Sequence, residues 1–199
     1  MLDLAIHVRD HLALATSALA IALLLGVPLG SAIAGSVRLR APSLGAIYVA
    51  RVVPSLAVLA IMLPLVGIGF WPALVALTLL AIPPIVLSTD IGLRGVPESV
   101  RDAARGLGMT RNQIGARVAW PLALPVVFSG IRTAAVEVVA SATLAAFIGG
   151  GGLGEYIVNG LAENDRPQLL EGALSVAVLA LATQWLLGGV ERQLANRAA

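Results

Sequence analysis

Two long stretches of this sequence carry no charged residue, and they restrict the possible folds more than any other feature. One runs from Leu12 to Val37 and the other from Val52 to Thr89. A helix needs about 20 apolar residues to cross the hydrocarbon core of a bilayer. Only 12% of the 199 residues are charged and 58% are hydrophobic, whereas about 25% of residues are charged in soluble domains. The sequence therefore predicts an integral membrane protein.

The lengths of the apolar stretches predict five membrane spans. The second charge-free stretch holds about 38 residues, and one helix of that length would extend about 57 Å, too long for a single crossing. We therefore expect a helical hairpin that turns at residues 67–72, where two glycines lie close to Pro72. Other prolines are expected to kink the helices, namely Pro54, Pro64, Pro83 and Pro84. The predicted fold is one all-α transmembrane domain over residues 1–199, with spans at about 12–34, 44–66, 71–87, 123–148 and 169–188.

All thirteen basic residues are arginines, and their positions predict the orientation of the spans. Cytoplasmic loops of membrane proteins carry an excess of basic residues. Only Arg9 and Arg166 fall on one side of the predicted topology, and Arg132 falls within a span. The other side holds Arg38, Arg40, Arg51, Arg94, Arg101, Arg105, Arg111, Arg117, Arg192 and Arg197. We therefore expect the N-terminus outside the cell and the C-terminus in the cytoplasm. Arginines clustered between apolar runs do not form a nucleic-acid patch, so no nucleic-acid partner is expected.

Lysine and cysteine are both absent from the chain. A P-loop requires a lysine that reaches the phosphates of ATP, so any ATP-driven work must come from another subunit. Without cysteine, disulfides and thiolate metal sites are impossible. His7 and His11 are spaced like two metal ligands on one helix face, but no third ligand lies nearby, so we expect no metal and no cofactor. An intramembrane enzyme is also disfavoured, because the spans hold no clustered pair of acidic residues.

The longest polar segment, residues 94–121, is predicted to lie in the cytoplasm between the third and fourth spans. Ala103, Ala104, Leu107 and Ile114 fall near helical spacing, and glycines interrupt the segment. We expect a short, bent, amphipathic element that faces a partner.

This segment resembles the EAA loop of permease subunits of bacterial ATP-binding-cassette importers. The family pattern is Glu-Ala-Ala, three residues, Gly, nine residues and Ile-x-Leu-Pro. The chain keeps this spacing with Asp102, Ala103, Ala104, Gly108, Val118, Trp120 and Pro121, and it departs from the pattern at the first, fifth and sixth of these positions. The resemblance implies a short coupling helix that contacts a cytoplasmic ATPase. It also implies a second permease subunit, identical or related, and an extracytoplasmic substrate-binding protein.

A wider likeness covers about Gly26 to the C-terminus. Residues 67–76, 130–133 and 143–160 resemble the glycine betaine, choline and carnitine branch of these permeases, and residues 147–156 resemble a glycine-rich loop of osmoprotectant and methionine permeases. The resemblance implies a methionine-permease-like fold. It also implies that the protein lies in a bacterial inner membrane, in contact with lipid. It further implies import of quaternary amines or proline by a non-catalytic subunit. Import of an amino acid such as methionine is an alternative, and so is an ATP-independent channel or carrier.

The glycine-rich run at residues 149–154 also satisfies the dinucleotide fingerprint G-x-G-x-x-G. That fingerprint has meaning only between a strand and a helix, and this run follows a membrane span. We interpret it as a turn at the outer surface. The resemblance implies that the substrate-binding protein docks there, with Gly151, Gly152, Gly154, Glu155 and Asn159 as candidate contacts.

Two ionisable residues lie inside the fourth span, where a charge costs several kcal/mol unless it is paired or faces water. Arg132 and Glu137 lie about 140° apart around a helix, so a direct pair is not expected, and Arg132 can extend toward the cytoplasm. Glu137 is therefore a candidate for the pathway or a subunit interface, and the alternative is a structural hydrogen bond to another helix. Thr133 and Ser141 share its span and either line the pathway or bond to another helix.

Two further features are expected to be structural. Gly26 and Gly30 form a small-xxx-small pattern that allows close approach of helices, within one subunit or between two. The Ala-Ile-Ala sequence at residues 32–34 resembles a signal-peptidase site, but the apolar run before it is too long and the basic residues follow it. We therefore expect the first span to be retained.

Overall fold

The computed structural model describes residues 2–53 and 55–198, and these residues are almost entirely helical, with no strand among them. The all-α class expected from the sequence is confirmed. In chain order the elements are α1 (Leu2–Ala34), α2 (Val37–Val52), α3 (Ser55–Val66), α4 (Phe70–Arg94), α5 (Glu98–Gly106), α6 (Arg111–Ile114), the π-helix η1 (Gly115–Ala119), α7 (Trp120–Ser141), the 3-10 helix η2 (Ala142–Ile148), α8 (Leu153–Ala162) and α9 (Arg166–Ala198).

Four helical stretches among the described residues are long and apolar enough to cross a membrane. They are Asp3–Ala34, Phe70–Gly95, Arg111–Ile148 and Arg166–Asn196. A fifth candidate is a broken one, made of Arg40–Val52 and Ser55–Val66, which are bent by 95° relative to each other. The sequence predicts one helix over 44–66, and the structure divides it in two. Pro54, expected to kink this helix, lies outside the described residues.

The chain turns between α3 and α4. Gly67 and Gly69 have φ values of 93° and 113°, in the left-handed region that favours glycine. The break therefore falls within the segment 67–72 where the sequence predicts a turn. α4 then continues through the adjacent Pro83 and Pro84, both of which are buried.

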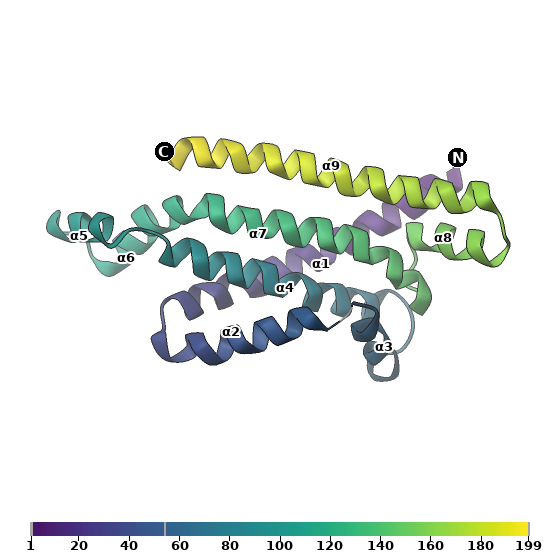
Figure 1. The fold of residues 1–199 in the computed structure, drawn as a ribbon, viewed down its shortest axis with the longest axis horizontal. Helices are drawn as coiled ribbons and strands as arrows, with labels where there is room; N and C mark the ends of the chain where they lie inside the picture. Colours follow the sequence, from purple (N-terminus) through teal and green to yellow (C-terminus); the bar gives the residue numbers. More distant parts are fainter. Residues whose placement is uncertain (1, 54, 199) are drawn as a thin grey trace.

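The long helices lie side by side, with α4 between α1 and α7, and with α9 against the outer side of α7 (Figure 1). The core between these helices includes Leu14, Leu77, Ile85 and Val138, each almost completely buried. α5, α6 and the C-terminal end of α9 lie at one end of the bundle, which we call the α5 end (Figure 1). The start of α1, α3 and α8 lie at the opposite end, which we call the α8 end.

Close packing of α1 on α4 depends on two small residues. A Cβ atom at Gly30 would lie 2.6 Å from Cβ of Thr89 and 2.8 Å from the carbonyl oxygen of Val86. A Cβ atom at Gly26 would lie 2.9 Å from Cγ2 of Ile85. Real Cβ atoms do not approach other atoms so closely, so a larger residue would push the helices apart. The small-xxx-small pattern therefore serves packing within this chain.

Candidate functional site

The polar segment between α4 and α7 projects beyond the bundle at the α5 end (Figure 1). α5 starts with Glu98, whose negative charge suits a helix N-terminus. After α5, Gly108 adopts φ +79°, and the chain turns toward α6. Thr110 and Gln113 then form a capping box, in which each backbone N–H donates to the other side chain, at 2.8 and 3.4 Å. Local sequence signals thus build two short helices joined by a tight turn.

Ionic contacts stabilise α5 and attach it to the bundle. Nη1 of Arg105 lies 2.8 Å from Oε1 of Glu98 and also pairs with Asp102. The hydrogen bond from Arg105 to Glu98, followed by that to Asp102, raises the pKa of Arg105 above its ordinary value. Nη2 of Arg101 donates to the carbonyl oxygen of Leu93 in the last turn of α4. The loop is therefore an ordered element held against α4.

The residues of the EAA-like pattern are distributed over α5, η1 and the start of α7. Asp102, Ala103 and Gly108 are exposed on or just after α5, whereas Ala104 is buried. Val118 is partly buried in η1, and Pro121 is exposed in the first turn of α7, a position where proline is favourable. The first half of the pattern thus forms the projecting tip, and the second half starts a long helix.

Leu107 is an exposed residue that the sequence reasoning did not select as a site. Its side chain is 83% exposed, directly before Gly108 at the tip of the loop. The side chain is therefore accessible to a partner. The sequence feature that could have indicated its exposure is its position between two glycines. Helical spacing alone assigned Leu107 to the apolar face of the predicted amphipathic element.

The candidate pathway residues lie along α7. Thr133 is exposed and Glu137, one turn later, is half-buried; Ser141 follows at the end of the helix and is also partly buried. The hydroxyl of Thr133 donates to the carbonyl oxygen of Ser129 at 3.0 Å, so its hydrogen bond is formed within the helix. Thr133 and Glu137 therefore share a face of α7 that this single chain does not fully cover.

Arg51 lies at a different place than its position in the sequence suggested. It was grouped with the basic residues near the connection between the first two spans. In the structure it lies near the end of α2, about 20 Å along the helix from its start at 1.5 Å per residue. Arg51 is exposed, and it lines the same cavity as Thr133 of α7, whose face also carries Glu137. A positive and a negative side chain thus face the same open side of the bundle.

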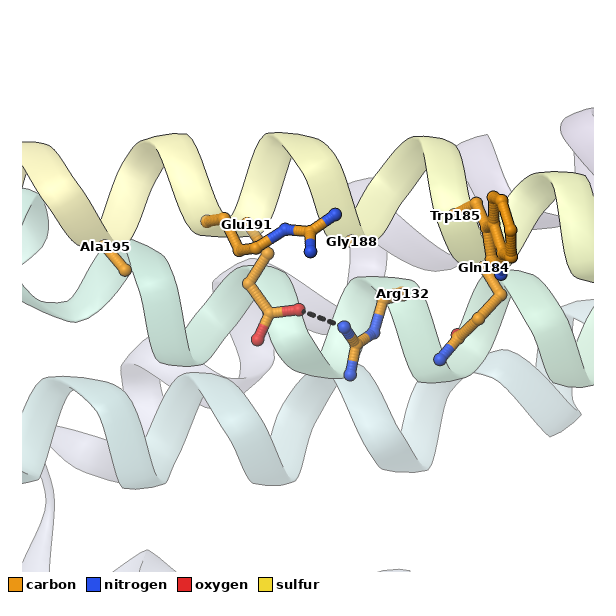
Figure 2. Close-up of a pocket in the computed structure, with 7 residues that line it drawn as sticks. Arg132, Gln184, Trp185, Gly188, Glu191 and Ala195 are labelled. Atoms are coloured by element: carbon orange, nitrogen blue, oxygen red, sulfur yellow. Dashed lines mark ion pairs between the residues drawn. The ribbon is translucent and has the colours of Figure 1, made fainter.

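Arg132 does not extend freely toward the cytoplasm, as expected from its position, but pairs with α9. Its Nη1 atom lies 2.7 Å from Oε2 of Glu191, and the two side chains point toward each other between α7 and α9 (Figure 2). They line a cavity of about 530 Å³ together with Gln184, Trp185, Gly188, Arg192 and Ala195. The ion pair offsets the cost of placing each charge in a membrane helix.

We expect Arg132→Leu to lower the thermal unfolding temperature of the purified protein. Removing one partner of a buried ion pair costs about 3–5 kcal/mol, and because both side chains are partly exposed we expect a loss near or below the lower end of that range. The exchange Arg132→Glu with Glu191→Arg should recover much of the stability in detergent. A double variant no more stable than Arg132→Leu would show that the pair does not stabilise α9.

α8 is attached to the start of α1 at the other end of the bundle. Nε2 of His7 lies 3.2 Å from Oε2 of Glu155, and the hydroxyl of Tyr156 donates to Oδ2 of Asp3 at 2.9 Å. His11 is completely buried, and its Nε2 lies 2.9 Å from the carbonyl oxygen of Val139. The two histidines thus make separate contacts, and within residues 2–53 and 55–198 no group of three metal-ligating side chains occurs.

The glycine-rich loop holds buried positions as well as accessible ones. Gly152 and Gly154 are buried, so in this conformation they pack the loop and cannot offer a surface to a partner. A Cβ atom at Gly154 would lie 2.0 Å from the carbonyl oxygen of Thr143, and one at Gly152 would lie 3.2 Å from His11. Gly151 and Glu155 are partly exposed and Asn159 is exposed. The accessible surface here is thus smaller than the sequence suggested.

Known transport proteins resemble the chain over nearly its whole length. Residues 22–196 match the family described as binding-protein-dependent transport system inner membrane component. The carnitine transport permease protein OpuCB of Listeria monocytogenes is 39% identical over 196 residues, covering 98% of this chain and 90% of that protein. The osmoprotectant import permease protein OsmW of Salmonella typhimurium is 42% identical over 186 residues, covering 89% and 85%. The glycine betaine/carnitine/choline permease protein OpuCB of Bacillus subtilis is 36% identical over 184 residues, covering 92% and 85%.

Solved structures share the fold of this chain. A chain of the MetNI methionine ABC transporter in an inward-facing conformation has a TM-score of 0.84 at 22% identity, covering 96% of this chain and 95% of that chain. A chain of an amino acid ABC transporter with histidines has a TM-score of 0.76 at 22% identity, covering 96% and 93%. The expected methionine-permease-like fold is therefore confirmed. Since the family match spans most of the sequence, the chain belongs to the family of inner membrane components of binding-protein-dependent transport systems.

Proposed function

We propose that this chain is the transmembrane subunit of an ATP-driven importer of osmoprotectants, such as glycine betaine, choline, carnitine or proline. The observation that carries the proposal is the identity of 36–42% with permeases whose names specify carnitine, osmoprotectants or glycine betaine and choline. The chain forms the translocation pathway, and ATP hydrolysis takes place on a partner.

Five spans are the proposed topology, with the broken helix α2–α3 as the second. The N-terminus lies outside the cell, and the α5 end with the C-terminus lies in the cytoplasm. The arrangement of basic residues supports this orientation, since Arg94, Arg101, Arg105 and Arg111 lie at or next to the projecting loop. The start of α1 and the end of α9 also lie at opposite ends of the bundle, as an odd number of crossings requires (Figure 1).

α5 is the proposed coupling helix that enters a groove on the ATPase. Its exposed tip offers Asp102, Ala103 and the largely exposed Leu107 to that partner. The tip is connected to two spans, to α4 by the anchor from Arg101 and to α7 by η1 with Val118 and the first turn with Pro121. ATP binding would shift the pathway between outward and inward access through these connections, because the ATPase binds the two states with different affinity.

A second permease subunit, identical or related, covers the open face that holds Thr133, Glu137 and Ser141. The charged side chains of Arg51 and Glu137 support this arrangement, because exposure of either charge to lipid would cost several kcal/mol. Lipid surrounds the remaining outer surface. At the α8 end an extracytoplasmic binding protein docks on Gly151, Glu155 and Asn159, and this protein supplies much of the substrate specificity.

The proposal predicts ATP-dependent, saturable uptake of at least one quaternary amine. We would reconstitute the chain with its ATPase, its partner permease and its binding protein in vesicles, and measure uptake of labelled glycine betaine, choline, carnitine, proline and methionine. Vesicles without ATP and vesicles without the ATPase are the controls. Methionine uptake alone would assign the importer to amino acids, and uptake that does not need ATP would indicate a channel or carrier.

A further inference from the structure

A cavity of about 340 Å³ lies along α4, between α2 and α7. α4 provides Pro84, Leu87, Ser88 and Ile91 to its lining; α2 provides Tyr48 and Arg51; and α7 provides Gly130 and Thr133. α2 and α7 each pack on α4. The cavity is therefore a groove with α4 as its base, open on the side that a second permease subunit would cover.

Gly130 determines how closely α7 approaches this base. A Cβ atom there would lie 2.2 Å from Oγ of Ser88 and 2.7 Å from the carbonyl oxygen of Pro84. The backbone of α7 therefore lies directly against α4 at this point. Thr133 and then Glu137 follow along α7, which places the carboxylate beyond one end of the same groove.

The two charges next to the groove belong to no salt bridge within the part of the chain that the structure describes. Neither Arg51 nor Glu137 forms a salt bridge with any residue in the described ranges 2–53 and 55–198. Glu137 nevertheless lies in Arg111–Ile148, a helical stretch long and apolar enough to span a membrane. Arg51 lies in the broken candidate span made of Arg40–Val52 and Ser55–Val66. An unpaired charge at that depth is retained where it meets water, another subunit or a charged ligand. The ring of Tyr48, 55% exposed, stands one turn before Arg51 on the same helix.

We propose that this groove is a transient binding site for a zwitterionic substrate within the pathway, with the substrate carboxylate on Arg51 and its quaternary ammonium group between Tyr48 and Glu137. The inference rests on the proposed function and adds the site and the substrate class. It assigns part of the substrate selection to the permease itself.

The chemistry of the three side chains matches such a substrate. A guanidinium group binds a carboxylate through two parallel hydrogen bonds. A quaternary ammonium group has no N–H to donate, so it is held by the face of an aromatic ring and by a nearby negative charge. Glycine betaine and carnitine carry both groups, whereas choline carries the ammonium group alone. Arg51 should therefore distinguish the zwitterions from choline.

The test compares glycine betaine with choline in the complete reconstituted transporter. A hydrogen bond to a charged group is worth enough to change binding by about tenfold or more. We expect Arg51→Gln to reduce glycine betaine uptake relative to choline uptake by about that factor, measured with saturating binding protein. Arg51→Lys keeps the charge but not the forked geometry and should give an intermediate ratio. Glu137→Gln and Tyr48→Leu should reduce uptake of both substrates.

Arg38→Gln, also on α2 but near its start and exposed, is the matched control and should leave the ratio unchanged. An Arg51→Gln transporter that loses both activities equally, or loses neither, would overturn the site. If Arg51→Gln does not assemble, an unchanged ratio in Arg51→Lys overturns it as well. Absence of any quaternary amine uptake by the unmodified transporter would instead overturn the proposed function.

Discussion

Gly108→Trp is expected to lower ATP-dependent uptake by about tenfold or more while leaving insertion into the membrane intact. Gly108 has φ +79°, and no atom lies within 4 Å of a Cβ built on it. A residue with a Cβ pays about 1–2 kcal/mol in this left-handed conformation, and about 1.4 kcal/mol corresponds to a factor of ten in affinity. The large ring would also project into the surface proposed to enter the ATPase groove. The measurement is vesicle uptake, normalised to the amount of inserted permease.

Gly189→Trp is the matched control. Gly189 also has open space around it, but it lies in α9 and has no left-handed backbone. We expect its uptake to stay close to that of the unmodified chain. Asp102→Lys, which reverses an exposed charge on α5, should reduce uptake as Gly108→Trp does. Normal uptake in both loop variants would refute the docking role of α5.

Gly154→Ala should be among the most destabilising single-methyl substitutions in the chain. The added Cβ would lie 2.0 Å from the carbonyl oxygen of Thr143 and 2.8 Å from its carbonyl carbon. These are backbone atoms, so relief requires α8 to move away from η2. Overpacking of this kind costs about 1–3 kcal/mol and occasionally more. The measurement is the thermal unfolding temperature of the protein in detergent, which does not depend on any partner.

The control here is Gly189→Ala, in a helix and with nothing within 4 Å of the new methyl group. Replacing a glycine inside a helix by alanine stabilises the helix by about 0.5–1 kcal/mol. The two substitutions are therefore expected to shift the unfolding temperature in opposite directions. Equal behaviour of the two variants would show that α8 does not pack on η2 as described.

Much of the fold could be predicted because lipid imposes simple rules on a sequence. The charge-free stretch from Leu12 to Val37 predicted a long helix, and α1 contains nearly all of it. The two glycines at 67 and 69 predicted a turn, and both adopt positive φ there. These signals are local, and hydrophobicity or backbone conformation alone determines them.

The errors arose where contacts distant in sequence decide the outcome. Hydropathy gives no sign that residues 44–66 divide into two helices at 95°, because the two pieces together are apolar enough to form one span. Arg51 was grouped with a basic loop, since its depth depends on where α2 begins. Gly152 and Gly154 were assigned to a docking surface, but their burial comes from His11 and Thr143, which no pattern in the loop reveals. Arg132 pairs with Glu191, about 60 residues later in the sequence.

α4 connects the anchor of α5 with the groove, which lies about 8–14 Å further along the helix at 1.5 Å per residue. Its last turn accepts the hydrogen bond from Arg101 that anchors α5, and two turns earlier Ser88 and Pro84 line the groove. α4 is one continuous helix over both places, so a movement at its last turn can reach the groove through the backbone. Displacement of α5 would then shift the base of the substrate groove directly. No relay of side-chain rearrangements through the bundle is required for this transmission.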